Sequence, residues 1–359
     1  MFVSNQSISE LASQLKPHVT NLLLLGEKTE LDLRQVLDEA NKKGFKVAGG
    51  IFPMVINEGE HHEAGCIIKH IQGDHDPFII EGIGKGKLDF ELPQLLDSDR
   101  SCLVFLDGLM VNISRFLERL YEQYWNRVDY VGAGCGSLSL QQTPCVFDNS
   151  GIYQDSALVL LSSEEMKLGV KHGWQKIDGP FVANKTDGNK VLELNWRPAF
   201  DVYREVVEAH SEVKFEGADF FSISKGFPFG IFKEGKEDIV RDPIAVDEDG
   251  ALVCVGNVSQ NVSLNILCGD SKKLIESATE AAAESVDEST QDMLIVDCIS
   301  RVLYLEDSFE EELKAIKKVI NSAGGEFQSE GVLSIGEISS SKEGYLELYN
   351  KTIVVSSFH

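Results

Sequence analysis

One plan occurs three times along the chain: an apolar strand, an amphipathic helix, a glycine-marked strand and a second apolar strand. The opening strands are expected at residues 21–26, 101–108 and 293–298. The helices follow at 30–43, 113–124 and 309–320, and the closing strands at 64–69, 156–161 and 351–355. Because one such unit cannot bury its apolar faces alone, the repetition predicts an α/β fold in which the units pack on one another.

The glycines of this plan recur in the third element of each copy, at residues 47–50, 131–136 and 333–337. Glycine lets a backbone approach another backbone or a ligand closely. We therefore expect shared architecture at these strand ends and a ligand pocket beside them, with Gly134 and Gly136 among its candidate residues.

Acidic residues dominate the composition, with 58 Asp and Glu against 33 Lys and Arg and a formal net charge of −25. A field of this sign repels phosphate backbones and anionic lipids, so we expect neither nucleic acid nor a membrane as partner. The seven cysteines form no C-x-x-C pair, which favours reduced thiols and a cytoplasmic location. The first residues lack a signal-peptide pattern, and the apolar runs are far shorter than the ~20 residues of a membrane span.

Caps and turns divide the chain further. We predict helix starts after Thr29, at Pro198 and, through a capping box of Ser308 and Glu311, at residue 309. An alanine-rich helix is expected at 271–285, and hairpin turns at 148–151 and 247–250.

The irregular stretch 212–230 places a domain boundary near residue 220, giving domains 1–220 and 221–359. Their doubled strands favour mixed sheets covered by helices, with αββα layering as one arrangement.

Several short motifs carry a family resemblance. In the first half they are YVGAGCGS (130–137), CVFDNSG (145–151), KHGW (171–174) and GNKVLELNWRPAFDVY (188–203). In the second half they are PFG (228–230), IAVDEDG (244–250), GD (269–270), CISR (298–301), GE (336–337) and YNKT (349–352). Together they resemble the FIST N domain and its partner, the FIST C domain. The chain departs from the family pattern at Asn195-Trp196 and at Tyr349.

This resemblance implies a sensory function in signal transduction. Related modules are small-ligand sensors that act with histidine kinases, cyclic-dinucleotide enzymes or chemoreceptors. It implies an amino-acid-like polar ligand, or alternatively a haem that senses nitric oxide. At 359 residues the chain would be a free-standing sensor without an output domain. An interaction scaffold without a ligand is the third hypothesis, favoured if no pocket of ~300 Å³ lies beside the candidate residues.

The candidate ligand-binding residues follow from their chemistry. His172 and Trp174 combine an imidazole with a flat aromatic wall, and their alternative is a packed corner. Arg301 and Glu337 sit at strand ends of the third copy, where they would hold the carboxylate and ammonium of an amino acid, or else pair with each other. The remaining candidates are Arg197, for a ligand carboxylate or a structural ion pair, and Tyr349 and Asn350 of the carboxy-terminal motif.

Other chemistry is less well supported by the residues. Cys135 lies in the glycine-rich turn, where it would be either an activated thiol or a buried inert one. For haem, the axial candidates are His172, His70, Cys135 and Tyr349. The histidines at 61, 62, 70 and 75 lack metal-site spacing, so we expect no metal and no cofactor. Without a catalytic motif of a hydrolase or phosphate-binding enzyme, we expect no enzyme activity.

Overall fold

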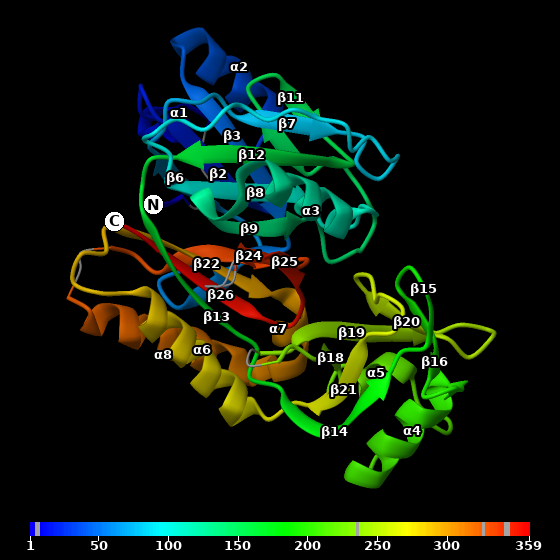
Figure 1. Ribbon diagram of the computed structural model, residues 1–359. Coiled ribbons are helices and arrows are strands. Elements are labelled where there is room, and N and C mark those ends of the chain that lie inside the picture. The colour runs from blue at the N-terminus through cyan, green and yellow to red at the C-terminus, as the bar shows by residue number, and fades with distance from the viewer. Residues whose placement is uncertain (4–7, 235–236, 325–326, 341–344) are drawn as a thin grey trace.

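The computed structural model describes residues 1–3, 8–234, 237–324, 327–340 and 345–359, which form four sheets and the helices around them (Figure 1). The first sheet has the order β1 (Phe2–Val3), β6 (Cys66–Ile71), β2 (Thr20–Gly26), β3 (Lys46–Phe52), β10 (Val146–Asp148) and β11 (Gly151–Tyr153). The second has the order β25 (Leu346–Tyr349), β24 (Glu337–Ser340), β9 (Asp129–Cys135), β8 (Ser101–Asp107), β12 (Ser156–Ser162) and β7 (Phe78–Glu81).

The other two sheets contain the rest of the strands. The third has the order β13 (Met166–Lys171), β26 (Ile353–Phe358), β22 (Asp292–Cys298), β23 (Glu330–Ser334), β4 (Met54–Asn57) and β5 (Glu60–His62). The fourth has the order β14 (Gln175–Val182), β21 (Ser263–Cys268), β18 (Phe229–Ile231), β19 (Ile239–Val246), β20 (Leu252–Val255), β16 (Lys190–Leu194) and β15 (Lys185–Asp187). A short strand, β17 (Arg197–Pro198), pairs with β16.

The three predicted repeats are confirmed, and each supplies the centre of one sheet. Every copy contains a parallel pair, β2 with β3, β8 with β9 and β22 with β23. Its closing strand then adds antiparallel to the first strand, as β6, β12 and β26. The mixed sheets expected from the doubled strands are therefore present.

The copies are locked together by a cyclic exchange of strands. After the glycine-marked strand of each copy the chain crosses into the sheet of another copy: β4 pairs with β23, β10 with β3, and β24 with β9. Copy one thus extends the third sheet, copy two the first, and copy three the second. Because each sheet contains strands of two copies, no copy can unfold without breaking a neighbour's sheet.

The recurring glycines are explained in part by this pairing. Gly49, Gly132 and Gly331 face the opening strand of their own copy. A Cβ atom at these positions would overlap the carbonyl oxygens of Leu23, Val104 and Ile295. The repeat therefore needs glycine at this position for close backbone approach.

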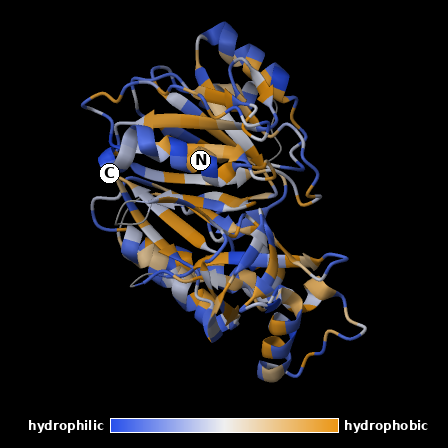
Figure 2. Cartoon of the chain, turned by 45° about the vertical axis from the view of Figure 1, so that its right-hand side comes forward, coloured by the Kyte–Doolittle hydropathy of each residue, from blue (hydrophilic) through white to orange (hydrophobic). Residues whose placement is uncertain are grey.

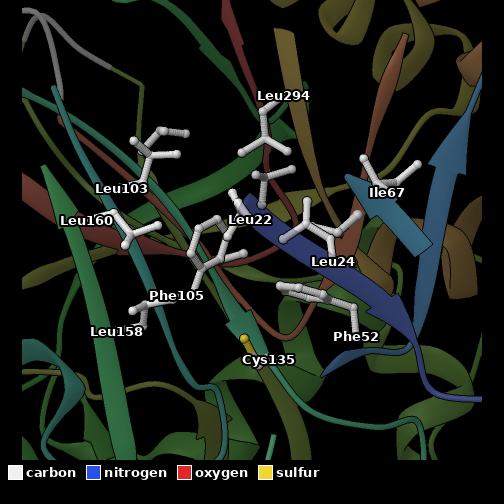
Figure 3. Close-up of a cluster of buried hydrophobic side chains, with 14 of the residues drawn as sticks. Leu22, Leu24, Phe52, Ile67, Leu103, Phe105, Cys135, Leu158, Leu160 and Leu294 are labelled. Carbon is white, nitrogen blue, oxygen red and sulfur yellow. The ribbon is translucent and has the colours of Figure 1, made fainter. Parts of the chain in front are cut away.

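A single hydrophobic core lies between the first three sheets. It contains Leu22, Phe52, Phe105, Val131 and Leu294, one or more from each sheet, and Figure 3 shows these sheets converging on it. In Figure 2 the strands near the middle of the molecule are largely hydrophobic. Burial of such side chains contributes about 1.5–3 kcal/mol each, so this core is what holds the copies together.

Helices cover the outer faces of the sheets. The first sheet carries α1 (Ile8–Gln14) and α2 (Leu33–Lys43), and the second carries α3 (Ile113–Tyr124), which is followed by η1 (Trp125–Arg127). The third carries α6 (Ser271–Ser285), α7 (Ile299–Leu305) and α8 (Phe309–Ser322), with η2 (Glu306–Ser308) between the last two. The fourth carries α4 (Ala199–His210) and α5 (Phe220–Ser224). Each of the first three sheets thus has helices on its outer face and the shared core on its inner face.

One predicted helix start and one predicted cap are wrong, although α8 begins at residue 309 as predicted. The helix expected after Thr29 begins at Leu33, because the Asp32 side chain accepts the backbone N–H of Gln35 and caps it. The capping box at Ser308 does not form, since Ser308 has helical backbone angles and makes no side-chain cap bond. The hairpin turns at 148–151 and 247–250 are confirmed by the pairs β10–β11 and β19–β20.

The boundary expected near residue 220 falls within α5. Strands on either side of it pair with each other, β13 with β26 and β14 with β21. The division into 1–220 and 221–359 stays a prediction.

Candidate ligand-binding site

A cavity of about 450 Å³ lies where the second, third and fourth sheets meet. One wall is the edge strand β13, and strands β24 and β25 form another; residues 233–234 and 237–238 before β19 and the end of α6 complete it. Its lining residues are Leu168, Val170, His172, Lys233, Glu234, Glu237, Asp238, Ile239, Glu284, Ser340, Tyr345, Glu347, Tyr349 and Thr352. This volume is within the range of small-molecule sites.

Two of the predicted site residues, His172 and Tyr349, line this cavity. Asn350 follows Tyr349 and is 2% exposed. Trp174 stands behind His172: its backbone N–H donates to His172 Nδ1 over 2.9 Å, and its indole N–H donates to the Lys351 carbonyl over 2.9 Å. Sequence stretches about 175 residues apart, near Trp174 and near Tyr349, are therefore brought together.

His172 is held as a neutral imidazole. Burial lowers its pKa to about 4. Because Nδ1 accepts the Trp174 N–H, the ring proton is on Nε2. Nε2 lies 3.7 Å from Glu237 Oε2, and both residues line the cavity. The ring therefore offers a hydrogen-bond donor on the cavity side.

Arg301 does not reach the cavity, although it was expected to hold a ligand. Its guanidinium is fully buried and pairs with Asp297 at 3.2 Å and Glu312 at 2.5 Å. A further N–H donates to the His172 carbonyl oxygen over 2.7 Å. Arg301 thus fixes the backbone of a cavity residue from behind.

Glu337 supports another part of the cavity lining in a similar way to Arg301. It is fully buried, accepts the Ser334 hydroxyl over 2.7 Å, and accepts the backbone N–H of Thr352 over 3.2 Å. Since Thr352 lines the cavity, Glu337 also acts through the backbone of a lining residue. Arg301 and Glu337 are neither ligand contacts in this geometry nor a direct ion pair among the described residues.

The remaining predicted residues lie elsewhere. Arg197 is on β17 of the fourth sheet, where its half-exposed side chain pairs with Glu205 at 2.5 Å. Gly134 and Gly136 lie at the crossing of copies two and three, where Ile335 occupies the space that a Cβ atom would need. Backbone bonds from Gly134 N–H to Gly336 and from Ile335 N–H to Gly134 close this contact. Packing therefore fills the glycine corner where a pocket was expected.

Cys135 belongs to the central core and is fully buried (Figure 3). Burial raises the pKa of its thiol well above the usual value. Hence we expect native protein to be alkylated by iodoacetamide only at the half-buried Cys268, while the six buried cysteines, Cys135 included, react after denaturation. Mass spectrometry of the peptides checks this. Rapid native labelling of Cys135 would contradict it.

Of the haem candidates, His172 and Tyr349 line the cavity, whereas His70 and Cys135 lie outside it. The Nε2 atom of His70 is 3.2 Å from the Gln14 carbonyl oxygen. Within the described residues, no group of three or more His, Cys, Asp or Glu side chains is arranged to hold a metal ion. The five carboxylates of the lining also disfavour the two propionates of haem.

Most lining residues were not predicted from the sequence, although the alternation of residues along two strands indicates some of them. Leu168 and Val170 share one face of β13, and His172 continues the same alternation directly after the strand ends at Lys171. Glu347 and Tyr349 share a face of β25 in the same way. What the sequence lacks is any indication that these two faces oppose each other.

Comparison with known proteins gives a clear family assignment. A family model described as the FIST N domain matches residues 22–197, and one described as the FIST C domain matches residues 199–340. The search among curated proteins finds no match. FIST domains are sensory domains of signal transduction. No described helix has the length and apolar character needed to cross a membrane. Because the two models together match most of its length, the chain belongs to the FIST family.

Proposed function

We propose that this chain is a small-ligand receptor in signal transduction and that the cavity between β13 and the β24–β25 hairpin is its binding site. The observation that carries the proposal is a cavity of about 450 Å³ lined by His172, Tyr349 and Thr352. Arg301 fixes the backbone of His172 from behind, and Glu337 fixes that of Thr352. A lining held in this way is preorganised, which lowers the free-energy cost of binding.

The position of the cavity also suggests how binding would be transmitted. Its lining comes from the second and third sheets and, through Ile239 and the residues before it, from the fourth. A ligand that contacts all three sheets stabilises the arrangement in which they lie together. A partner such as a histidine kinase or a cyclic-dinucleotide enzyme would respond to this arrangement.

A thermal-shift screen of polar metabolites tests the site. We expect a ligand that raises the melting temperature, by an amount that grows with its concentration. Val170→Phe places a ring in the cavity and should weaken that ligand at least tenfold. Val213→Phe, which makes the same change at a partly exposed position away from the cavity, should leave binding unaltered.

The same screen separates the alternatives. A ligand that binds Val170→Phe and the parent chain equally would place the site elsewhere. The absence of any shift across the screen would favour an interaction scaffold. A haem-dependent Soret band that disappears in His172→Ala protein would favour the gas-sensor hypothesis instead.

A further inference from the structure

The cavity has an unbalanced set of charges. Two ammonium groups are available to it, Lys233 in the lining and Lys171 at its edge. Five carboxylates line it: Glu234, Glu237, Asp238, Glu284 and Glu347. The described residues therefore leave an excess of negative charge around the cavity.

The ion pairs that form do not use up these carboxylates. Lys171 is shared between Glu284 at 3.0 Å and Glu237 at 3.7 Å. Lys233 lies 3.4 Å from Glu347. An ionised carboxylate has about four lone-pair sites, so Glu237, Glu284 and Glu347 keep the capacity to accept further N–H donors.

His172 gives a second and independent indication of a ligand. The residue is only 8% exposed, and its Nδ1 is occupied by the Trp174 N–H. Its Nε2–H has no hydrogen-bond acceptor among the residues that the structure describes, and Glu237 Oε2 is 3.7 Å away. This donor lies on the cavity wall, where a ligand oxygen can accept its proton.

The rest of the lining is apolar. Leu168, Val170 and Ile239 present aliphatic side chains, and Tyr345 and Tyr349 present aromatic rings. Aliphatic side chains suit the methylene stem of a ligand. Aromatic faces attract organic cations.

From these features, and resting on the proposed receptor function, we propose that the ligand is a small organic cation: an ammonium group on a short aliphatic stem that ends in an uncharged oxygen. The carboxylates hold the ammonium group, and His172 Nε2–H donates to the oxygen. An amino alcohol has this chemistry. A free α-amino acid does not, because its own carboxylate would face the excess negative charge.

Four compounds with the same five-carbon stem test the ligand class by calorimetry. We expect 5-aminopentan-1-ol to bind at least tenfold more tightly than 5-aminopentanoate, and 5-hydroxypentanoate not to bind. Pentylamine, which lacks the oxygen, should bind several-fold more weakly than the amino alcohol. Equal or tighter binding of the zwitterion or the anion would overturn the inference and leave the receptor function standing.

Matched variants then test the residues. Glu237→Gln and Glu347→Gln should each weaken the amino alcohol about tenfold, which corresponds to about 1.4 kcal/mol. Glu216→Gln removes the same charge from an exposed position outside the cavity and should change affinity less than twofold. An equal loss in Glu216→Gln protein would mean that only the overall field matters, which would overturn the proposed site.

The role of His172 is tested with His172→Asn. Asparagine keeps an oxygen near the position of Nδ1 for the Trp174 N–H but removes the Nε2 donor. The amino alcohol should then bind no better than pentylamine, whose affinity should not change. If none of the four compounds binds the parent chain, the ligand class is wrong, and the metabolite screen with Val170→Phe still decides the receptor function.

Discussion

Replacing Arg301 by methionine will destabilise the fold by about 3–5 kcal/mol at pH 7, the usual result of removing one partner from a buried ion pair. Its guanidinium is fully buried between Asp297 and Glu312, which are fully buried themselves. Methionine fills much of the space but leaves two carboxylates without their cation. It also removes the donors to the His172 and Leu274 carbonyl oxygens.

Urea denaturation of the parent chain and the variant measures this loss. The matched control is Arg197→Met, which breaks an Arg–Glu pair whose side chains are 51% and 57% exposed. Solvent screens that pair, so the control should lose less than about 1 kcal/mol. Equal losses in the two variants would show that burial does not govern the strength of these pairs.

The destabilisation should also depend on pH. Burial, followed by the charge of Glu312, raises the pKa of Asp297 well above its ordinary value. Loss of the Arg301 cation favours protonation of Asp297 further, and that protonation removes its unpaired charge. The variant should therefore recover stability relative to the parent chain as pH falls from 7 toward 5. A constant difference over this range would mean that lost packing, not unpaired charge, causes the defect.

The sequence allowed the repeated elements to be predicted because their signals are local. Alternating apolar residues, an amphipathic stripe and a turn such as Asp148–Gly151 each depend on a few neighbouring side chains. The helices at 113–124 and 271–285 are confirmed to the residue. Cyclic strand exchange was not predictable in the same way. Nothing within β4, β10 or β24 specifies which copy it will join.

The candidate site was predictable only in part for the same reason. Arg301 and Glu337 were correctly placed near strand ends of the third copy. Their burial, however, depends on α8, which brings Glu312 to Arg301, and on the segment that brings Thr352 to Glu337. A charged residue at a strand end is either a ligand contact or a support for one, and its distant neighbours decide which.

Glu337→Gln will make the protein more stable than the parent chain above pH 8, the second large effect that we expect. Burial raises the pKa of Glu337 to about 8, against the lowering effect of hydrogen bonds from Ser334, Cys298 and Thr352. Between its ordinary value of 4.5 and about 8 the folded state holds a proton that the unfolded state has lost. Stability from this group therefore falls as pH rises across that interval and stays low above it.

The magnitude follows from the same linkage. Each pKa unit corresponds to about 1.36 kcal/mol, so ionising Glu337 inside the fold costs on the order of a few kcal/mol. Glutamine does not titrate, and its amide oxygen can still accept one of the N–H or O–H donors. Relative to the parent chain, Glu337→Gln should gain on the order of a few kcal/mol between pH 5 and pH 9, whereas the exposed Glu216→Gln should show little change.

Denaturant unfolding of the parent chain, Glu337→Gln and Glu216→Gln at pH 5, 7 and 9 measures both the sign and the size of the change in the free energy of unfolding. If the stability difference between the parent chain and Glu337→Gln instead stays constant from pH 5 to pH 9, Glu337 is already ionised in the fold at pH 5. In that case its hydrogen bonds and the charge of Arg301 outweigh desolvation. Thr352 would then be anchored by a charge-assisted hydrogen bond, which is about twice as strong as a neutral one. The two outcomes differ in how rigidly Glu337 holds the cavity wall at physiological pH, and so in how far a ligand could move it.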